Sequence, residues 1–252
     1  MVLSTRVSLQ WLPNEPEELT STMVFTSTKD HFVDVRIYKE RYPYKQTGTE
    51  PENFEDVFQW VIVGEEEEIK NTNKIRFNHS INSQEITTSL ATGKPLSECR
   101  GDADVGSFWP MEGTEDRKET GSMAHPDTGV LTDYVEIWRS LNPNVTSPDN
   151  EVREGHDEAG QLIPNTVTPV MTFDLNAEGF IGRIIRLGDW VQGVIYEETE
   201  KQFPISVMRS FRDAHTGAWT ELITYGKHAF PEAYRHATAQ MESEYGKWHR
   251  VE

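Results

Sequence analysis

The sequence has one cysteine, a shortage of basic residues and no long apolar run. Because Cys99 stands alone among 252 residues, these residues cannot form an internal disulfide, which is typical of a reducing compartment. Lys and Arg number 24 against 42 Asp and Glu, a formal charge of −18. We therefore expect no nucleic-acid partner and no attraction to anionic membranes. No stretch approaches the ~18 apolar residues of a membrane helix, and the first residues lack the build of a secretory signal. We expect a cytoplasmic protein.

Motifs for nucleophilic, metal and nucleotide chemistry are also missing. The chain has no Gly-x-Ser-x-Gly, no phosphate loop and no Gly-x-Gly-x-x-Gly turn. Its eight histidines show no ligand spacing, and Asp102-Ala103-Asp104 lacks the further oxygen ligands of a calcium loop. Cys99 lies among Gly and charged residues without a nucleophile signature, so a spectator role is favoured over a catalytic one. We expect no metal and no cofactor.

What the sequence does contain is short segments with the period-2 pattern of strands. In residues 32–38, Val33, Val35 and Ile37 share one face, while Phe32, Asp34, Arg36 and Tyr38 share the other. Residues 58–63 are apolar on both faces, as expected for a strand with a core on one side and a lined pocket or packing on the other. Residues 74–81 alternate again. The run Glu65–Glu68, followed by Asn71–Asn73, predicts an exposed hairpin turn.

The rest of the chain alternates between breakers and strands. Residues 91–117 are rich in Gly and Pro and are predicted to be mostly loop, and residues 142–165 a linker. Residues 119–123 and 134–139 flank the turn His125–Gly129 as a hairpin. Pro231–Tyr234 begins like a helix, and Tyr234, Ala237, Met241 and Tyr245 follow at helical spacing. Further strands are predicted at 169–173, 180–186, 189–196, 205–211 and 219–225.

Two runs of short strands without alternating helices favour antiparallel sheets, and closure into barrels removes their exposed edges. We therefore predict a mainly β protein with two small antiparallel barrels, residues 1–145 and 146–252, and a short C-terminal helix. A sandwich is the alternative. Aromatic residues beside polar groups on strands, such as Trp190, Gln192 and Tyr196 on one face, suit a pocket for a flat organic molecule. The alternative is that they are core residues.

Several segments resemble the fungal Hri protein family, which is named for interaction with an Hrr-type casein kinase. They are the strand Trp190–Gly193, the strand end Thr224–Lys227, the hairpin from Thr120 to Trp138 and the strand Phe58–Trp60. The resemblance follows most of the chain in order. It implies a fold of paired calycin-like barrels related to lipocalin-like carriers. It also implies two functional branches: housekeeping cytosolic proteins, and hetero-Diels–Alderases of fungal tropolone–sesquiterpenoid pathways.

Two functions therefore stay open. The first is a cofactor-free pericyclase that joins a tropolone ortho-quinone methide to a humulene-type alkene in a dry, orienting pocket. The second is a non-catalytic ligand-binding or kinase-interacting adaptor protein. A simple carrier of an apolar metabolite is an intermediate possibility between these two. Apolar small molecules are the expected partners, and paired small barrels are compatible with a homodimer. From strand faces, the candidate catalytic hydrogen-bond donors are Arg76, Trp190, Gln192, Tyr225 and Lys227, with Trp60, Trp138 and Tyr196 as substrate-binding walls.

Overall fold

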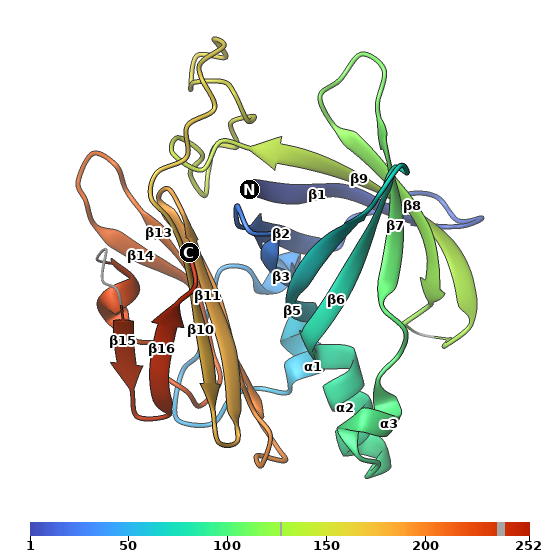
Figure 1. Cartoon of the computed structure of the whole chain (residues 1–252), viewed down its shortest axis with the longest axis vertical. Helices are drawn as coiled ribbons and strands as arrows, with labels where there is room; N and C mark the ends of the chain where they lie inside the picture. Colours follow the sequence, from blue (N-terminus) through green and yellow to red (C-terminus); the bar gives the residue numbers. More distant parts are fainter. Residues whose placement is uncertain (127, 236–239) are drawn as a thin grey trace.

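A closed antiparallel barrel forms the first half of the chain, as predicted. The computed structural model describes residues 1–126, 128–235 and 240–252 (Figure 1). The strands are joined around the barrel in the order β1-β2-β3-β5-β6-β7-β8-β9, with β9 pairing back to β1. Their bounds are β1 Val2–Trp11, β2 Thr20–Thr26, β3 His31–Tyr38, β5 Phe58–Ile69, β6 Lys74–Asn82, β7 Asp104–Pro110, β8 Arg117–Ala124 and β9 Leu131–Leu141.

The segment predicted to be mostly loop, 91–117, contains the strand that completes the barrel. β7 pairs with β6 and β8 although it carries Gly106 and ends at Pro110, because pairing on both sides outweighs the weak strand preference of these residues. The predicted hairpin turn is confirmed at Asn71–Asn73, whereas Glu65–Glu68 continue β5 up to that turn.

Short helices gather at one end of the barrel (Figure 1). α1 spans Phe54–Val57, α2 Ser83–Thr92 and α3 Leu96–Cys99. The Asn82 side chain accepts from the backbone N–H of Gln84 at the start of α2, and Gly93 ends it with a φ of 70°. No helix among the described residues is long and apolar enough to cross a membrane.

The second half forms an eight-stranded sheet that does not close, which corrects the predicted second barrel. Its order is β15-β16-β10-β11-β12-β13-β14-β4. One edge is β4 (Tyr44–Lys45), which comes from the first half and pairs parallel to β14; the other edge is β15, and these two do not pair. The predicted boundary at residue 145 falls between β9 and β10, and the division stays a prediction. The remaining bounds are β10 Val170–Ala177, β11 Phe180–Leu187, β12 Trp190–Glu197, β13 Ile205–Arg212, β14 Trp219–Tyr225, β15 Gln240–Ser243 and β16 Gly246–Arg250.

The predicted C-terminal helix is wrong in the described residues. After residue 230, the described residues contain one helical turn, the 3-10 turn Glu232–Arg235. A second 3-10 turn, Lys39–Arg41, lies in the first half of the chain. β15 and β16 then pair as an antiparallel hairpin. Met241 and Trp248 are buried against the face of the sheet that points away from the barrel. Ala237 lies outside the described residues. Met241 lies in β15 and Tyr245 in the turn that follows it, so their helical spacing did not indicate a helix.

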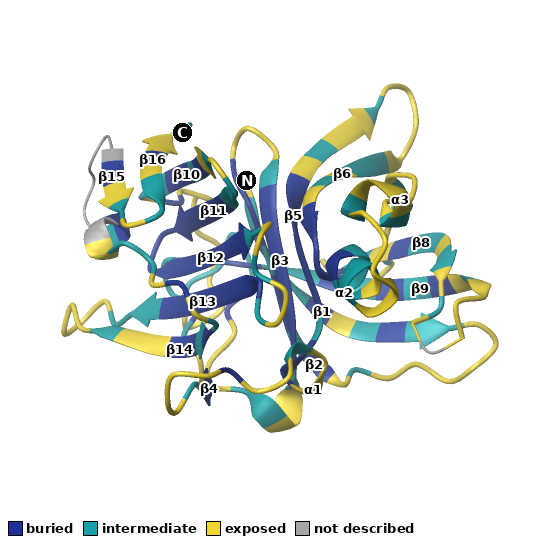
Figure 2. Ribbon diagram, turned by 90° about the horizontal axis from the view of Figure 1, so that it is seen from below, coloured by how far each residue is buried: buried dark blue, intermediate teal, exposed yellow. Residues whose placement is uncertain are grey.

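The main hydrophobic core lies between the barrel and the second sheet (Figure 2). The apolar face of β3, with Val33, Val35 and Ile37, belongs to the same core as Trp190 and Tyr196 of β12. At about 1.5–3 kcal/mol for each fully buried aliphatic side chain, this layer is a large contribution to stability. The consequence for the barrel is that the opposite, polar face of β3 points inward.

Candidate functional site

An internal cavity of the barrel is lined by the polar faces of its strands. On β3, Phe32, Asp34 and Arg36 face this cavity. Its volume is about 90 Å³, several times the ~10–15 Å³ that one water molecule needs. Hollows of about 320, 360 and 520 Å³ lie elsewhere in the described residues. We take the barrel cavity as the candidate site because several buried charged and aromatic side chains meet there.

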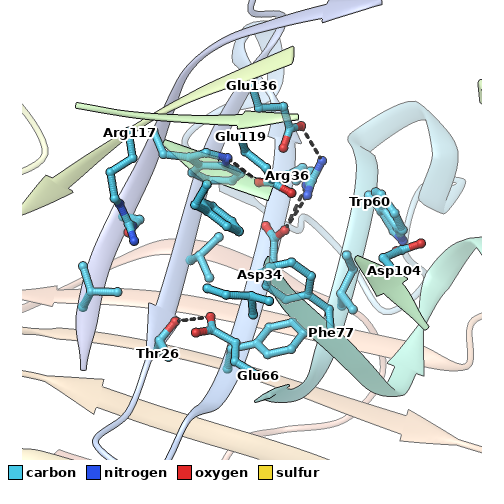
Figure 3. Close-up of a pocket in the computed structure, with 18 of the residues that line it drawn as sticks. Thr26, Asp34, Arg36, Trp60, Glu66, Phe77, Asp104, Arg117, Glu119 and Glu136 are labelled. Atoms are coloured by element: carbon cyan, nitrogen blue, oxygen red, sulfur yellow. Dashed lines mark hydrogen bonds and ion pairs between the residues drawn. The ribbon is translucent and has the colours of Figure 1, made fainter. Parts of the chain in front are cut away.

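Arg36 and Glu136 form the centre of a buried ion network (Figure 3). The Arg36 Nε donates to Asp34 Oδ2 at 2.9 Å, and its Nη1 donates to Glu136 Oε1 at 3.3 Å. Arg6 also donates to Glu136 Oε1, at 2.6 Å, and to Glu18. Burial opposes the charge of Arg36, but Asp34 and Glu136 outweigh it and raise its pKa. The network therefore holds Arg36 as a fixed cation inside the barrel.

Glu119 is a buried carboxyl without a direct cation. Its Oε1 accepts from the Tyr134 hydroxyl at 2.9 Å and its Oε2 from the Trp138 indole N–H at 2.8 Å. Burial, with the negative charge of Glu136, raises the pKa of Glu119 to about 8. Glycine on the neighbouring strand makes room for it, because a Cβ at Gly106 would lie 2.2 Å from its Oε1. At neutral pH Glu119 is a protonated acid in the cavity wall.

Two tryptophans form aromatic walls beside Arg36. The guanidinium carbon of Arg36 lies 4.8 Å from the Trp60 ring centroid and 6.0 Å from that of Trp138, within cation–π range. Asn82 accepts from the Trp60 indole N–H at 2.8 Å and fixes that ring. The site thus combines flat apolar surfaces with a buried positive charge.

Further titratable groups line the rest of the cavity. Glu66 accepts from the Thr26 hydroxyl at 2.9 Å, and burial raises the pKa of its carboxyl. His79 Nε2 lies 3.6 Å from Asp104 Oδ2. Burial lowers the pKa of His79 and raises that of Asp104. The cavity is therefore crowded with carboxyl groups that resist ionisation.

Two polar atoms at the cavity have no hydrogen-bond partner among the described residues. One is Oδ1 of Asp34, a residue that is 3% exposed, and the other is Nε of Arg117. Burial raises the pKa of Asp34 in spite of Arg36. Unpaired buried polar atoms are costly, so these two point to a missing occupant of the cavity.

Of the eight residues proposed from the sequence, the structure places Trp60 and Trp138 in this cavity and the other six outside its lining. Arg76 lies on the outer face of β6 with 43% of its side chain exposed and pairs with Glu67. Lys227 pairs with Glu200 at 2.7 Å. The Tyr225 hydroxyl donates to the backbone oxygen of a loop residue at 2.8 Å.

The three proposed residues on β12 face the core between sheet and barrel. Gln192 donates to the backbone oxygens of Met23 and Val33 at 3.0 and 2.9 Å, and accepts from Arg209. Trp190 donates to a backbone oxygen at 2.9 Å, and Tyr196 packs in the same core. The shared face predicted for these residues is confirmed, and it joins the two halves of the protein.

A serine, a histidine and a carboxylate also stand in hydrogen-bonded series in the second sheet. Ser206 Oγ lies 2.9 Å from His228 Nδ1, and His228 Nε2 lies 2.9 Å from Glu197 Oε2. Ser206 is fully buried and its hydroxyl also accepts from the His228 backbone N–H. This arrangement ties down the turn after β14 and gives no substrate access to a nucleophile. In the described part of the chain, no group of three His, Cys, Asp or Glu residues is arranged to hold a metal.

Comparison with known proteins places the chain in a family. The family described as Protein HRI1 matches residues 2–252. The chain belongs to the HRI1 family. This confirms the resemblance predicted from the sequence. The HRI1 protein of Kluyveromyces lactis is 24% identical over 206 residues, which cover 78% of this chain and 74% of that protein. The crystal structure of the uncharacterised protein YLR301w of Saccharomyces cerevisiae covers 100% of this HRI1-family chain and 98% of its own, with a TM-score of 0.72 and 19% identity. At that identity the likeness shows a shared fold.

Proposed function

We propose that this HRI1-family protein binds a compact organic molecule inside its first barrel. The observation that carries the proposal is the unpartnered Oδ1 of Asp34, held between the aromatic walls and the ion network of an internal cavity. A ligand that donates a hydrogen bond to this oxygen would satisfy it, while the rings of Trp60 and Trp138 would cover an apolar body. The protein would then act as a carrier or sensor of that molecule.

Blocking the cavity tests the proposal. Val24→Phe adds a ring to the cavity lining, whereas Val105→Phe makes the same change at a position that is 37% exposed. A library of small ring compounds would be screened by thermal shift, and hits measured by calorimetry. We expect hits that bind the wild-type protein and Val105→Phe with equal affinity and bind Val24→Phe at least ~10-fold more weakly. Equal binding to all three proteins would place the ligand elsewhere.

Cofactor-free cycloaddition is a second candidate, and the position of Glu119 favours it. A neutral carboxylic acid beside two indole walls can donate a hydrogen bond to a developing oxyanion of a heterodiene, which lowers the barrier. The quinone methide and the alkene would have to lie against the aromatic walls Trp60 and Trp138 for the reaction to occur in this cavity.

Incubation with a tropolone quinone-methide precursor and humulenol tests that candidate. One stereoisomer formed faster than in a boiled control, with loss of selectivity in Trp138→Leu, would support the pericyclase. If neither cycloaddition nor ring-compound binding is found, the adaptor hypothesis is favoured, and binding to a purified Hrr-type casein kinase would test it. A size measurement by light scattering addresses the homodimer.

A further inference from the structure

We infer that the barrel cavity takes a small organic cation, such as a protonated amine that carries one ring. This inference rests on the proposed function and adds the charge of the ligand to it. The lining contains five carboxyl groups against two guanidinium groups and one imidazole. The carboxyl groups are Asp34, Glu66, Asp104, Glu119 and Glu136.

The protein's own cations do not neutralise this set. Arg36 is shared between Asp34 and Glu136, and Arg6 between Glu136 and Glu18. These two arginines therefore face three carboxylates. A lining with more carboxyl than basic groups favours a cationic occupant, which stabilises their ionised forms, and disfavours an anion.

Two further carboxyl groups, held toward their neutral forms by burial, would ionise more readily beside a bound cation. Glu119 and Glu66 accept from hydroxyl and indole groups, and no cation lies within ion-pair distance of either among the described residues. His79, the nearest base to Asp104, is held toward its neutral form by burial. Arg117 is the further guanidinium in the lining; it donates a 3.4 Å hydrogen bond to Ser4 and lies 5.8 Å from the Phe108 ring centroid.

Asp34 supplies the specific anchor. Its Oδ2 is occupied by Arg36, while its buried Oδ1 has no partner among the described residues and can accept from an ammonium N–H. Figure 3 shows Asp34 and Arg36 joined in the middle of the cavity, with Glu136 on one side and the Glu66–Thr26 pair on the other. The aromatic walls suit the ring of such a ligand.

Three probes with the same ring and chain length separate charge from shape: 2-phenylethylamine, 2-phenylethanol and 3-phenylpropionate. Their affinities for the full chain would be measured by calorimetry at pH 7. We expect the amine to bind at least ~10-fold more tightly than the alcohol, and the carboxylate more weakly than both. Asp34→Asn is expected to lower the ratio of amine affinity to alcohol affinity to about two or less. Asp133→Asn, an exposed position on β9, is the matched control and should behave as wild type.

The outcomes separate this inference from the proposed function. Alcohol or carboxylate binding that equals or exceeds amine binding overturns the cationic ligand and leaves a cavity that binds neutral or anionic molecules. Binding of none of the three overturns both. If Asp34→Asn does not fold, as judged by circular dichroism, the order of the three probes on the wild-type protein still decides the matter.

Discussion

Replacing Glu119 with glutamine should change how the stability of the protein depends on pH. The wild-type carboxyl ionises at about pH 8 in the folded protein, against an ordinary value of 4.5 in the unfolded chain. Because the folded state holds this proton more tightly, the contribution of Glu119 to stability is complete below pH 4.5. It declines as the pH rises and is lost once the carboxyl ionises near pH 8. At about 1.4 kcal/mol per pH unit, the loss is at most about 5 kcal/mol.

Glutamine retains the contacts of the neutral acid. Its amide oxygen can accept from the Trp138 indole, and its amide nitrogen can donate to the Tyr134 oxygen. The variant should therefore match the wild type near pH 5 and become more stable than it as the pH approaches 9. Urea unfolding followed by circular dichroism at each pH unit from 5 to 9 gives the difference in free energy of unfolding.

The control for this series is Glu68→Gln, at an exposed position of β5. It should run parallel to the wild type at every pH. If the difference between wild type and Glu119→Gln stays constant within about 1 kcal/mol across the series, Glu119 does not titrate in this window. The description of Glu119 as a neutral acid in the cavity wall would then be wrong.

Three further substitutions test the structural roles assigned above. Gln192→Leu removes hydrogen bonds to two backbone oxygens and takes away the acceptor of the buried Arg209 Nε. The free energy of unfolding should therefore fall by about 2–4 kcal/mol, and an unchanged urea midpoint would contradict this. Gly121→Ala places a Cβ 2.6 Å from the Tyr134 hydroxyl. We expect the free energy of unfolding to fall by about 1–3 kcal/mol and ligand binding, measured by calorimetry, to weaken. Wild-type values for both quantities would refute the close packing. Ser206→Ala should destabilise the protein by about 1 kcal/mol without changing ring-compound binding, whereas loss of an esterase activity would assign Ser206 a catalytic role.

The strands were largely predictable from the sequence, but the direction in which they face was not. Alternation in residues 32–38 identified the two faces of β3 correctly. The apolar pattern of 58–63 indicated a core on one side and a pocket or packing on the other, and the second side lines the cavity. An alternating pattern does not say which face meets water, however. Asp34 and Arg36 look solvent-exposed in the sequence and are buried in the structure.

The candidate site was missed for the same reason. Trp60 and Trp138 were found through their aromatic bulk, whereas Glu119 and Glu136 are two among 42 acidic residues. The pairing of β8 with β9 brings them together with β3 across the barrel, and that depends on closure through β7. Gly106 was one signal available in advance, since glycine in a strand often marks the close approach of another group.

Separation of the hydrophobic core from the cavity lining has a consequence for how such proteins diversify. The large apolar cluster lies outside the barrel, against the second sheet, while the interior holds only a small apolar cluster around Trp60. Mutations that alter the inner face therefore sample new ligands without disturbing the layer that contributes most to folding. The Saccharomyces cerevisiae structure keeps this fold at 19% sequence identity, so the residues of the inner face can change widely while the architecture stays the same.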